Sequence, residues 1–331
     1  IYSTSDNIAY PYTNTSQTVN AVYSRTLTIT YANSGGSGAA PSNSTAIQYY
    51  NSGGTVTNVS TPLFTLAANT YDPPTGMHFK TWNLGQENSS YTGWTPNEND
   101  TVITKAAIAE WEPNTGTITY DKNASDATGT TAASEYTYGI TNKFNANGYS
   151  RAGYTFSGWN TYANGSGTTY DANTVNNEIK TLFPAGSGTV YAQWSKDTYT
   201  ITYNLNKGSG STNPIHTNPK TSYQVDTDTF SLINPTRTGY SFRGWTGSNG
   251  STAQTSVSVT KGSTGNKNYT ANWTANTYTI QYAGMEGASF GTNHPTSGSF
   301  DTAFTVNNPT KEYYIFKGWN ITGMDSVTHT Y

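Results

Sequence analysis

The sequence predicts a mostly-β protein, an elongated tandem array of small modules of about 80 residues each. The first observation is that one alternating motif recurs, ending at Tyr31, Tyr120, Tyr203 and Tyr282, which are 89, 83 and 79 residues apart. The second is that only 33% of the residues are hydrophobic, too few for one large core. The third is an aromatic content of 14%, which argues against disorder.

The opening strand of each module is the motif that ends at these tyrosines. It reads TLTITY, TGTITY, TYTITY and TYTIQY in the four copies. In the third copy Tyr199, Ile201 and Tyr203 share one face, and threonines occupy the other. Such period-two alternation of aromatic and β-branched residues is typical of a half-buried strand.

A second strand ends in tryptophan in each copy, as in YTFSGWN and YSFRGWT. A phenylalanine precedes the tryptophan by 18 residues in the first copy and by 15 in each of the other three, so the first copy carries an insertion. Glycine stands before the tryptophan except in the first copy, where Thr81 replaces it. A glycine at this position permits a β-bulge or a close backbone approach.

The closing strand reads AIAEW, VYAQW and YTANW in the first three copies. Alternation places Val190, Ala192 and Trp194 on one face, where the small alanine leaves room for the indole. The three signatures together predict the module cores, which comprise Tyr31, Phe64, Trp82, Trp111, Tyr120, Phe144, Tyr154, Phe156, Trp159, Trp194, Tyr203, Phe230, Tyr240, Phe242, Trp245, Trp273, Tyr282, Phe304, Phe316 and Trp319.

The module boundaries follow from the order of these strands. We expect repeat 1 with its insertion over residues 26–113, repeat 2 over 114–197, repeat 3 over 198–276, and an incomplete repeat 4 over 277–331 that lacks a closing strand. Residues 1–25 are expected to be the closing strand of a preceding or neighbouring-subunit repeat. Their segment VNAVYSR matches VYAQWSK and places Val19, Ala21 and Tyr23 inward.

Two interpretations of these ends remain open. The sequence is a window from a longer array, or it is a filament subunit whose N-terminal donor strand completes the last module of the next subunit. Strand addition is an established mode of assembly, and a head-to-tail contact that does not close produces an open filament. The expected partner is then a second copy of the chain.

The ordered segments TYTITYNLN, NPTRTGYSFRGWTG and GSTGNKNYTANW resemble the Listeria–Bacteroides repeat, also called the internalin-type B-repeat. The resemblance covers nearly the whole chain and is strongest from 115 to 320. It implies a β-grasp-like module found in tandem on bacterial and some archaeal surface proteins. It therefore also implies an extracellular or cell-surface location and a structural or adhesive role without catalytic residues.

Charge and cysteine content exclude several classes of function. A net charge of −3 with scattered Lys and Arg gives no basic stripe for nucleic acid. The absence of cysteine excludes disulfides, thiolate metal sites and a cysteine nucleophile. No apolar run in this sequence approaches the roughly 18 residues of a membrane span.

Candidate chemistry is sparse, and we expect no enzyme, cofactor or metal. The histidines, His78, His216, His294 and His329, have no metal-ligand spacing. Asp226 and Asp228 lack the further acids and the glycine of a calcium loop, so a solvated turn is expected. Glu110 and Glu112 lie on the outward face of a strand, where general acid–base catalysis is not expected.

Two kinds of surface contact remain as hypotheses. Trp94, in YTGWTPN, lies outside the repeat signatures and is the candidate ligand contact of an alternative function, an adhesin that binds glycan or protein through the repeat 1 insertion (residues 31–79 and 84–100). Asn249, Asn272 and Asn320 stand in glycosylation sequons, and Asn272 faces away from the core. Cell-wall components and surface glycans are the other expected partners.

Overall fold

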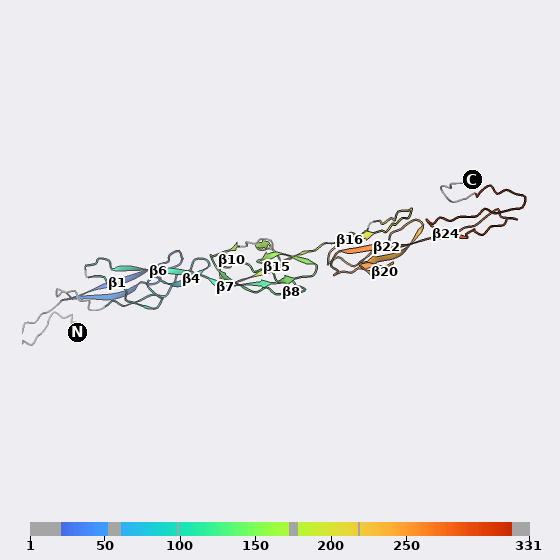
Figure 1. The fold of residues 1–331 in the computed structure, drawn as a ribbon. Coiled ribbons are helices and arrows are strands. Elements are labelled where there is room, and N and C mark those ends of the chain that lie inside the picture. The colour runs from blue at the N-terminus through green and yellow to red at the C-terminus, as the bar shows by residue number, and fades with distance from the viewer. Residues whose placement is uncertain (1–20, 52–60, 98, 172–177, 218, 320–331) are drawn as a thin grey trace, which may run out of the picture. The chain divides into compact units, whose positions relative to one another are not determined.

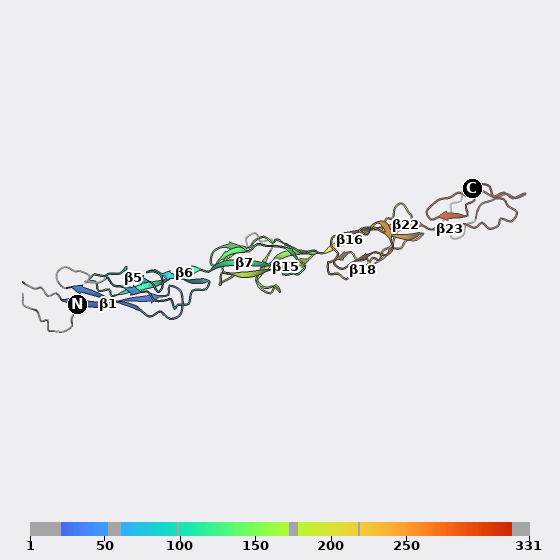
Figure 2. The same cartoon turned by 90° about the horizontal axis from the view of Figure 1, so that it is seen from below.

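The computed structural model describes residues 21–51, 61–97, 99–171, 178–217 and 219–319. Every regular element in these ranges is a β-strand, and successive groups of strands follow the chain from blue to red (Figures 1 and 2). The chain forms two compact units. One takes in Ile1–Asp121, Thr130–Gly148 and Gly158–Ala192; the other takes in Lys122–Gly129, Tyr149–Ser157 and Gln193–Tyr331. The prediction of a mostly-β tandem repeat protein is confirmed.

Repeat 1 lies in the first unit and forms a four-stranded sheet in the order β2-β1-β6-β4. Its strands are β1 (Val22–Ala32), β2 (Ser44–Asn51), β4 (Met77–Trp82) and β6 (Thr104–Pro113). The short strands β3 (Phe64–Thr65) and β5 (Ser90–Tyr91) pair separately. The opening strand β1 runs parallel to β6 and antiparallel to β2.

Repeat 2 forms a five-stranded sheet in the order β13-β12-β15-β7-β9. Its strands are β7 (Thr115–Asp121), β9 (Ser134–Thr137), β12 (Tyr154–Asn160), β13 (Thr169–Asp171) and β15 (Gly188–Lys196). Two small pairs join β8 (Thr128–Gly129) to β11 (Tyr149–Ser150) and β10 (Asn142–Lys143) to β14 (Glu178–Ile179).

Repeat 3 lies in the second unit and forms a five-stranded sheet in the order β17-β16-β22-β19-β20. Its strands are β16 (Tyr199–Asn204), β17 (Ser222–Tyr223), β19 (Tyr240–Gly247), β20 (Gly250–Gln254) and β22 (Lys267–Ala275). A separate pair joins β18 (Phe230–Ser231) to β21 (Ser258–Val259).

In all three repeats the closing strand is central and lies between the opening strand and the Gly-Trp strand. The parallel register is the same throughout: Ala107 lies opposite Tyr31, Val190 opposite Tyr120, and Tyr269 opposite Tyr203. On the other side of the closing strand, Ala109 lies opposite Trp82 and Ala271 opposite Trp245. A repeat without its closing strand therefore lacks the strand that joins its two halves.

The Gly-Trp strand is bulged against the closing strand, as expected from its glycine. In repeat 3 the register shifts between Phe242 and Gly244, and Gly244 has a positive φ of 124°. Repeat 1 shifts at the same place even though Thr81 replaces the glycine. The bulge turns the tryptophan into the core, where Trp82, Trp159 and Trp245 are only 1%, 3% and 0% exposed.

The expected core residues divide into three groups in the structure. Tyr31, Phe64, Trp82, Tyr120, Trp159 and Trp245 are buried. Trp111, Phe144, Tyr154, Phe156, Trp194, Tyr203, Phe230, Tyr240, Phe242, Trp273, Tyr282, Phe316 and Trp319 are partly buried. Phe304 is 48% exposed, which corrects its placement in a core, because no strand covers this part of repeat 4 in the described residues.

The repeat junctions within each unit share one geometry, built on a turn before the Gly-Trp strand. The left-handed glycines of these turns are Gly76, Gly153 and Gly239, with φ of 78°, 79° and 80°. Each glycine carbonyl accepts a hydrogen bond from the chain just after the closing strand, from the N–H groups of Asn114 (2.8 Å), Asp197 (3.0 Å) and Asn276 (2.9 Å). A Cβ atom on the glycines would overlap Tyr138, Val225 and Phe300, which belong to the next repeat. Glycine is thus required because a large side chain covers its bare Cα atom.

Candidate strand-binding groove

Repeat 4 contains two strands within its described residues 277–319, β23 (Thr277–Thr279) and β24 (Ser297–Ser299), which pair antiparallel. Its opening strand is therefore three residues long, against six for β16 in repeat 3. The described residues 314–319, which carry the Gly-Trp motif, form no strand. Both segments pair with the closing strand in the complete repeats, and neither has such a partner in the described part of repeat 4.

An open groove of about 1500 Å³ lies between these two segments. Its lining is mostly apolar and includes Tyr278, Ile280, Tyr282, Phe304, Phe316 and Trp319. The residues that correspond to Ile280 and Trp319 in repeat 3, Ile201 and Trp245, are 4% and 0% exposed. The groove thus occupies the position that β22 fills in repeat 3.

Part of the core of repeat 4 is assembled around Trp319. The ring centroids of Tyr282 and Phe316 lie 5.3 and 5.1 Å from the indole, as those of Tyr203 and Phe242 lie 5.4 Å from Trp245. The indole N–H of Trp319 is buried without a hydrogen-bond acceptor, whereas that of Trp245 donates to Asn234 Oδ1 at 3.1 Å. The groove is therefore partly preformed, and the buried indole N–H of Trp319 has no hydrogen-bond partner within the described residues.

The register of the complete repeats specifies what would fit this groove. A closing strand must place one side chain opposite Tyr282, a small residue opposite Trp319 and an aromatic residue opposite Phe316, as Tyr269, Ala271 and Trp273 do in repeat 3. Val19, Ala21 and Tyr23 have this spacing and chemistry. Val19 lies outside the described residues, Ala21 is exposed and Tyr23 is 61% exposed.

The strand β1 begins at Val22, before the expected boundary after Arg25, and continues unbroken through Ala32. Val22–Arg25 pair with Gln48–Asn51 in the sheet of repeat 1. The Arg25 guanidinium also donates to the carbonyl oxygens of Pro96, Asn97 and Asp100 in the same repeat, at 3.2, 2.8 and 2.7 Å. Alternation indicates which side chains share a face, but it does not reveal this partner strand.

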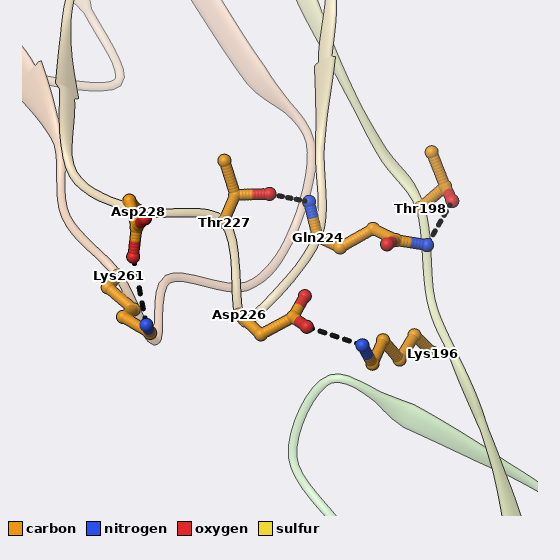
Figure 3. A network of polar contacts seen from close by, with 7 residues as sticks. All are labelled: Lys196, Thr198, Gln224, Asp226, Thr227, Asp228 and Lys261. Carbon is orange, nitrogen blue, oxygen red and sulfur yellow. Dashed lines mark hydrogen bonds and ion pairs between the residues drawn. The ribbon is translucent and has the colours of Figure 1, made fainter.

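Asp226 and Asp228 each face a lysine instead of converging on one point (Figure 3). Asp226 pairs with Lys196 at the end of repeat 2, and Asp228 Oδ1 lies 2.9 Å from Lys261 Nζ. The hydrogen bond from Lys196 lowers the pKa of the Asp226 carboxyl. The turn therefore ties repeat 2 to repeat 3 by an exposed ion pair. The described residues contain no group of three or more His, Cys, Asp or Glu side chains placed to hold a metal.

Asp301 carries the corresponding contact between repeats 3 and 4. Its carboxylate accepts hydrogen bonds from the Ser211 hydroxyl, from the Ser211 N–H at 2.8 Å and from the Tyr240 hydroxyl at 2.9 Å. The Ser211 hydroxyl contributes most to lowering the pKa of Asp301. A lowered carboxyl pKa stabilises the contact above the ordinary carboxyl range, and the contribution is lost as the pH falls through the folded pKa.

We predict that hydrogen exchange around residues 297–300 becomes faster below about pH 4, after correction for the intrinsic pH dependence of exchange. Asp301→Asn should give the fast rate at pH 7 and remove most of this pH dependence. Asp228→Asn is the matched control, because its partner Lys261 lies within repeat 3. Equal protection of the wild-type segment at pH 7 and pH 3 would contradict the assignment.

Trp94, the candidate ligand contact, packs inside repeat 1. Its indole stacks on Phe64, with the ring centroids 5.8 Å apart and an interplanar angle of 20°. One face of the ring is thus covered by the core of the repeat. Trp94 also borders an open hollow lined by residues 93–96 and 99–102.

The two candidate glycosylation sites within the described residues, Asn249 and Asn272, have hydrogen-bonded amide nitrogens. Asn272 Nδ2 donates to Gly244 O, Thr246 Oγ1 and Thr270 O at 3.1 to 3.2 Å, so its amide is engaged within repeat 3. Asn249 Nδ2 donates to Trp245 O at 2.7 Å. Asn320 and His329 lie outside the described residues.

The other histidines serve local contacts. His78 Nδ1 is 2.9 Å from Asn114 Oδ1, and His294 Nδ1 is 3.2 Å from Gly291 O. His216 is more enclosed than expected for a surface residue, since its ring packs 4.7 Å from Tyr203 and 5.5 Å from Trp245. Its position beside the core of repeat 3 was not signalled by its sequence context.

The three strand signatures and their common register correspond to a known repeat. The Listeria-Bacteroides repeat domain matches residues 117–193, 199–274 and 278–329. The chain belongs to this family. These matches cover repeats 2 and 3 and most of repeat 4, which confirms the resemblance seen in the sequence.

A relative of this Listeria-Bacteroides repeat protein is described as a Gly-rich membrane protein of Evansella cellulosilytica. It is 31% identical over 176 residues, which are 51% of this chain and 19% of the relative. The chain thus spans about a fifth of the length of that relative. No helix with the length and apolar character of a bilayer crossing occurs among the residues that the structure describes.

Proposed function

We propose that this chain is a structural protein of a bacterial or archaeal cell surface, and that its copies associate head to tail. In this association the N-terminal strand of one copy closes the fourth repeat of the next and extends the array. The work is mechanical rather than catalytic, since nearly every distinctive side chain recurs from repeat to repeat. Membership of the Listeria-Bacteroides repeat family and the likeness to a Gly-rich membrane protein support a surface location.

The open groove of repeat 4 is the observation that carries this proposal. It is apolar, and the strand it lacks has the spacing of Val19, Ala21 and Tyr23. In the complete repeats the closing strand leads directly into the next opening strand, as β6 ends at Pro113 and β7 begins at Thr115. A donor strand that runs into β1 would reproduce this connection between two copies.

Disulfide trapping tests the register, because the chain has no cysteine of its own. Asn268 lies opposite Thr202 in repeat 3, so Thr18 should lie opposite Gln281 in the neighbouring copy. Paired positions in a sheet are close enough for a disulfide. Oxidation of the full chain carrying Thr18→Cys and Gln281→Cys should give a ladder of covalent multimers.

The matched control joins Thr18→Cys with Tyr162→Cys, which places the second thiol in an exposed turn of repeat 2. This pair should not give the ladder. A ladder of equal yield from both pairs would show non-specific collision. If neither pair gives a ladder, strand exchange between copies is overturned, and a different strand must close the groove.

A further inference from the structure

Tyr313 occupies a backbone conformation that disfavours a side chain. Its φ is 68° and its side chain is 95% exposed. It stands in the turn where repeats 1 to 3 have Gly76, Gly153 and Gly239. The turn is otherwise of the same kind, since Lys311 lies over the Tyr314 ring as Arg237 lies over that of Tyr240. A strained residue whose side chain is almost fully exposed points to a role outside its own turn.

The end of repeat 1 at which Arg25 pairs with Gln48, called here its leading end, also differs from the corresponding end of the other repeats. Gln48, paired with Arg25, takes the place that Tyr138, Val225 and Phe300 hold in repeats 2 to 4. Gln48 is fully buried, and its Nε2 donates to the Pro96 carbonyl at 2.9 Å. The insertion thus covers this end of repeat 1, whereas in later repeats the glycine turn of the preceding repeat does so.

Beside Pro96 the insertion leaves an open hollow of about 650 Å³. Trp94, Pro96 and Val102 contribute apolar surface to it, and Asn99 and Asp100 supply polar groups. Val102 is 61% exposed although it is aliphatic. The lining exposes more polar than apolar surface, so it offers hydrogen-bond partners for a tyrosine hydroxyl beside apolar contacts for the ring.

We propose that Tyr313 of one copy docks into the hollow lined by residues 93–96 and 99–102 of the next copy. This inference rests on the proposed strand exchange, which would bring the turn of repeat 4 against the leading end of repeat 1. At the internal junctions a large side chain covers a bare glycine. At the junction between copies the large side chain belongs to the turn, and the hollow belongs to the following repeat.

Docking of this kind explains why two departures from the repeat pattern occur together. Tyr313 replaces glycine only in the repeat whose groove is open, and the insertion occurs only in the repeat that follows the donor strand. Each would block a regular junction: tyrosine because a Cβ atom does not fit there, the insertion because it already covers Gln48. Together they distinguish the contact between copies from the contacts within a copy.

The test is a double-mutant cycle on the association of the full chain, measured by sedimentation. Tyr313→Gly relaxes the backbone and should not impair folding, yet it should weaken association about tenfold or more, as expected for a buried interface tyrosine. Val102→Ala should weaken it less, and the two effects should not add. Tyr162→Gly is the matched control, since Tyr162 is also exposed in a turn.

Three outcomes are decisive. Weaker association by Tyr313→Gly but not by Tyr162→Gly, with coupling to Val102→Ala, supports the docking. Undiminished association of Tyr313→Gly, alongside disulfide ladders through Thr18→Cys and Gln281→Cys, overturns the docking while strand exchange stands. No association of the unmodified chain overturns both.

Discussion

Ala21→Glu is expected to weaken head-to-tail association about a hundredfold or more, whereas Val22→Glu should leave it nearly unchanged. Ala109, Ala192 and Ala271, which correspond to Ala21, are almost completely buried. A carboxylate at this position would be buried against Trp319 without a partner, which costs several kcal/mol, and each 1.4 kcal/mol is about tenfold in affinity. Val22 faces outward, where the closing strands carry Glu110, Gln193 and Asn272.

The two variants are matched, because they introduce the same residue at adjacent positions that are both exposed in the single chain. Sedimentation of the full chain measures association, and hydrogen exchange resolved by repeat should show repeat 1 unchanged in both variants. Equal effects of the two substitutions would mean that charge, and not the face of the strand, controls association. That result would contradict the assignment of Ala21 to the inward face and Val22 to the outward face of the strand, on which strand exchange depends.

Trp245→Ala should destabilise repeat 3 by about 3–5 kcal/mol, the usual range for removing a buried large aromatic residue. The indole is fully buried and contacts Tyr203, Phe242 and His216. Trp319→Ala should destabilise repeat 4 by less in the unassociated chain, because the groove leaves the corresponding core incomplete. In associated chains the effect of Trp319→Ala should approach that of Trp245→Ala.

Hydrogen exchange resolved by repeat is the suitable measurement, since a tandem array unfolds in parts and one global free energy would not be well defined. Protection in residues 199–275 should fall sharply in Trp245→Ala. Equal losses of protection from Trp245→Ala and Trp319→Ala in the unassociated chain would contradict the assignment of repeat 4 as an open module.

The periodicity of the sequence is sufficient to predict the strands and the buried tryptophans. Alternation marks the inward face directly, so TYTITY and VYAQW are assigned to strands from their residues alone. The glycine turns are equally visible, in PPTG, SRAG and TRTG against TKEY, but their role depends on Tyr138, Val225 and Phe300, which lie far along the chain. Comparison of the four copies position by position would have singled out Tyr313.

Other features could not be predicted because they depend on three-dimensional neighbours. Asn272 faces away from the core as expected, yet the bulge at Gly244 brings a carbonyl oxygen to its amide. Arg25 looked like the end of a separate strand, but three carbonyl oxygens of the insertion hold it in repeat 1. Alternation defines a face and leaves the partner of that face undefined.

Electron cryo-microscopy of the associated chain, with helical reconstruction, tests strand exchange most directly. Strand exchange predicts density for residues 18–24 of one copy between the opening and Gly-Trp segments of repeat 4 in the next. Val19 should lie opposite Tyr282, Ala21 opposite Trp319 and Tyr23 opposite Phe316. Copies that meet through other surfaces, with the groove of repeat 4 empty or filled by another segment, would contradict it.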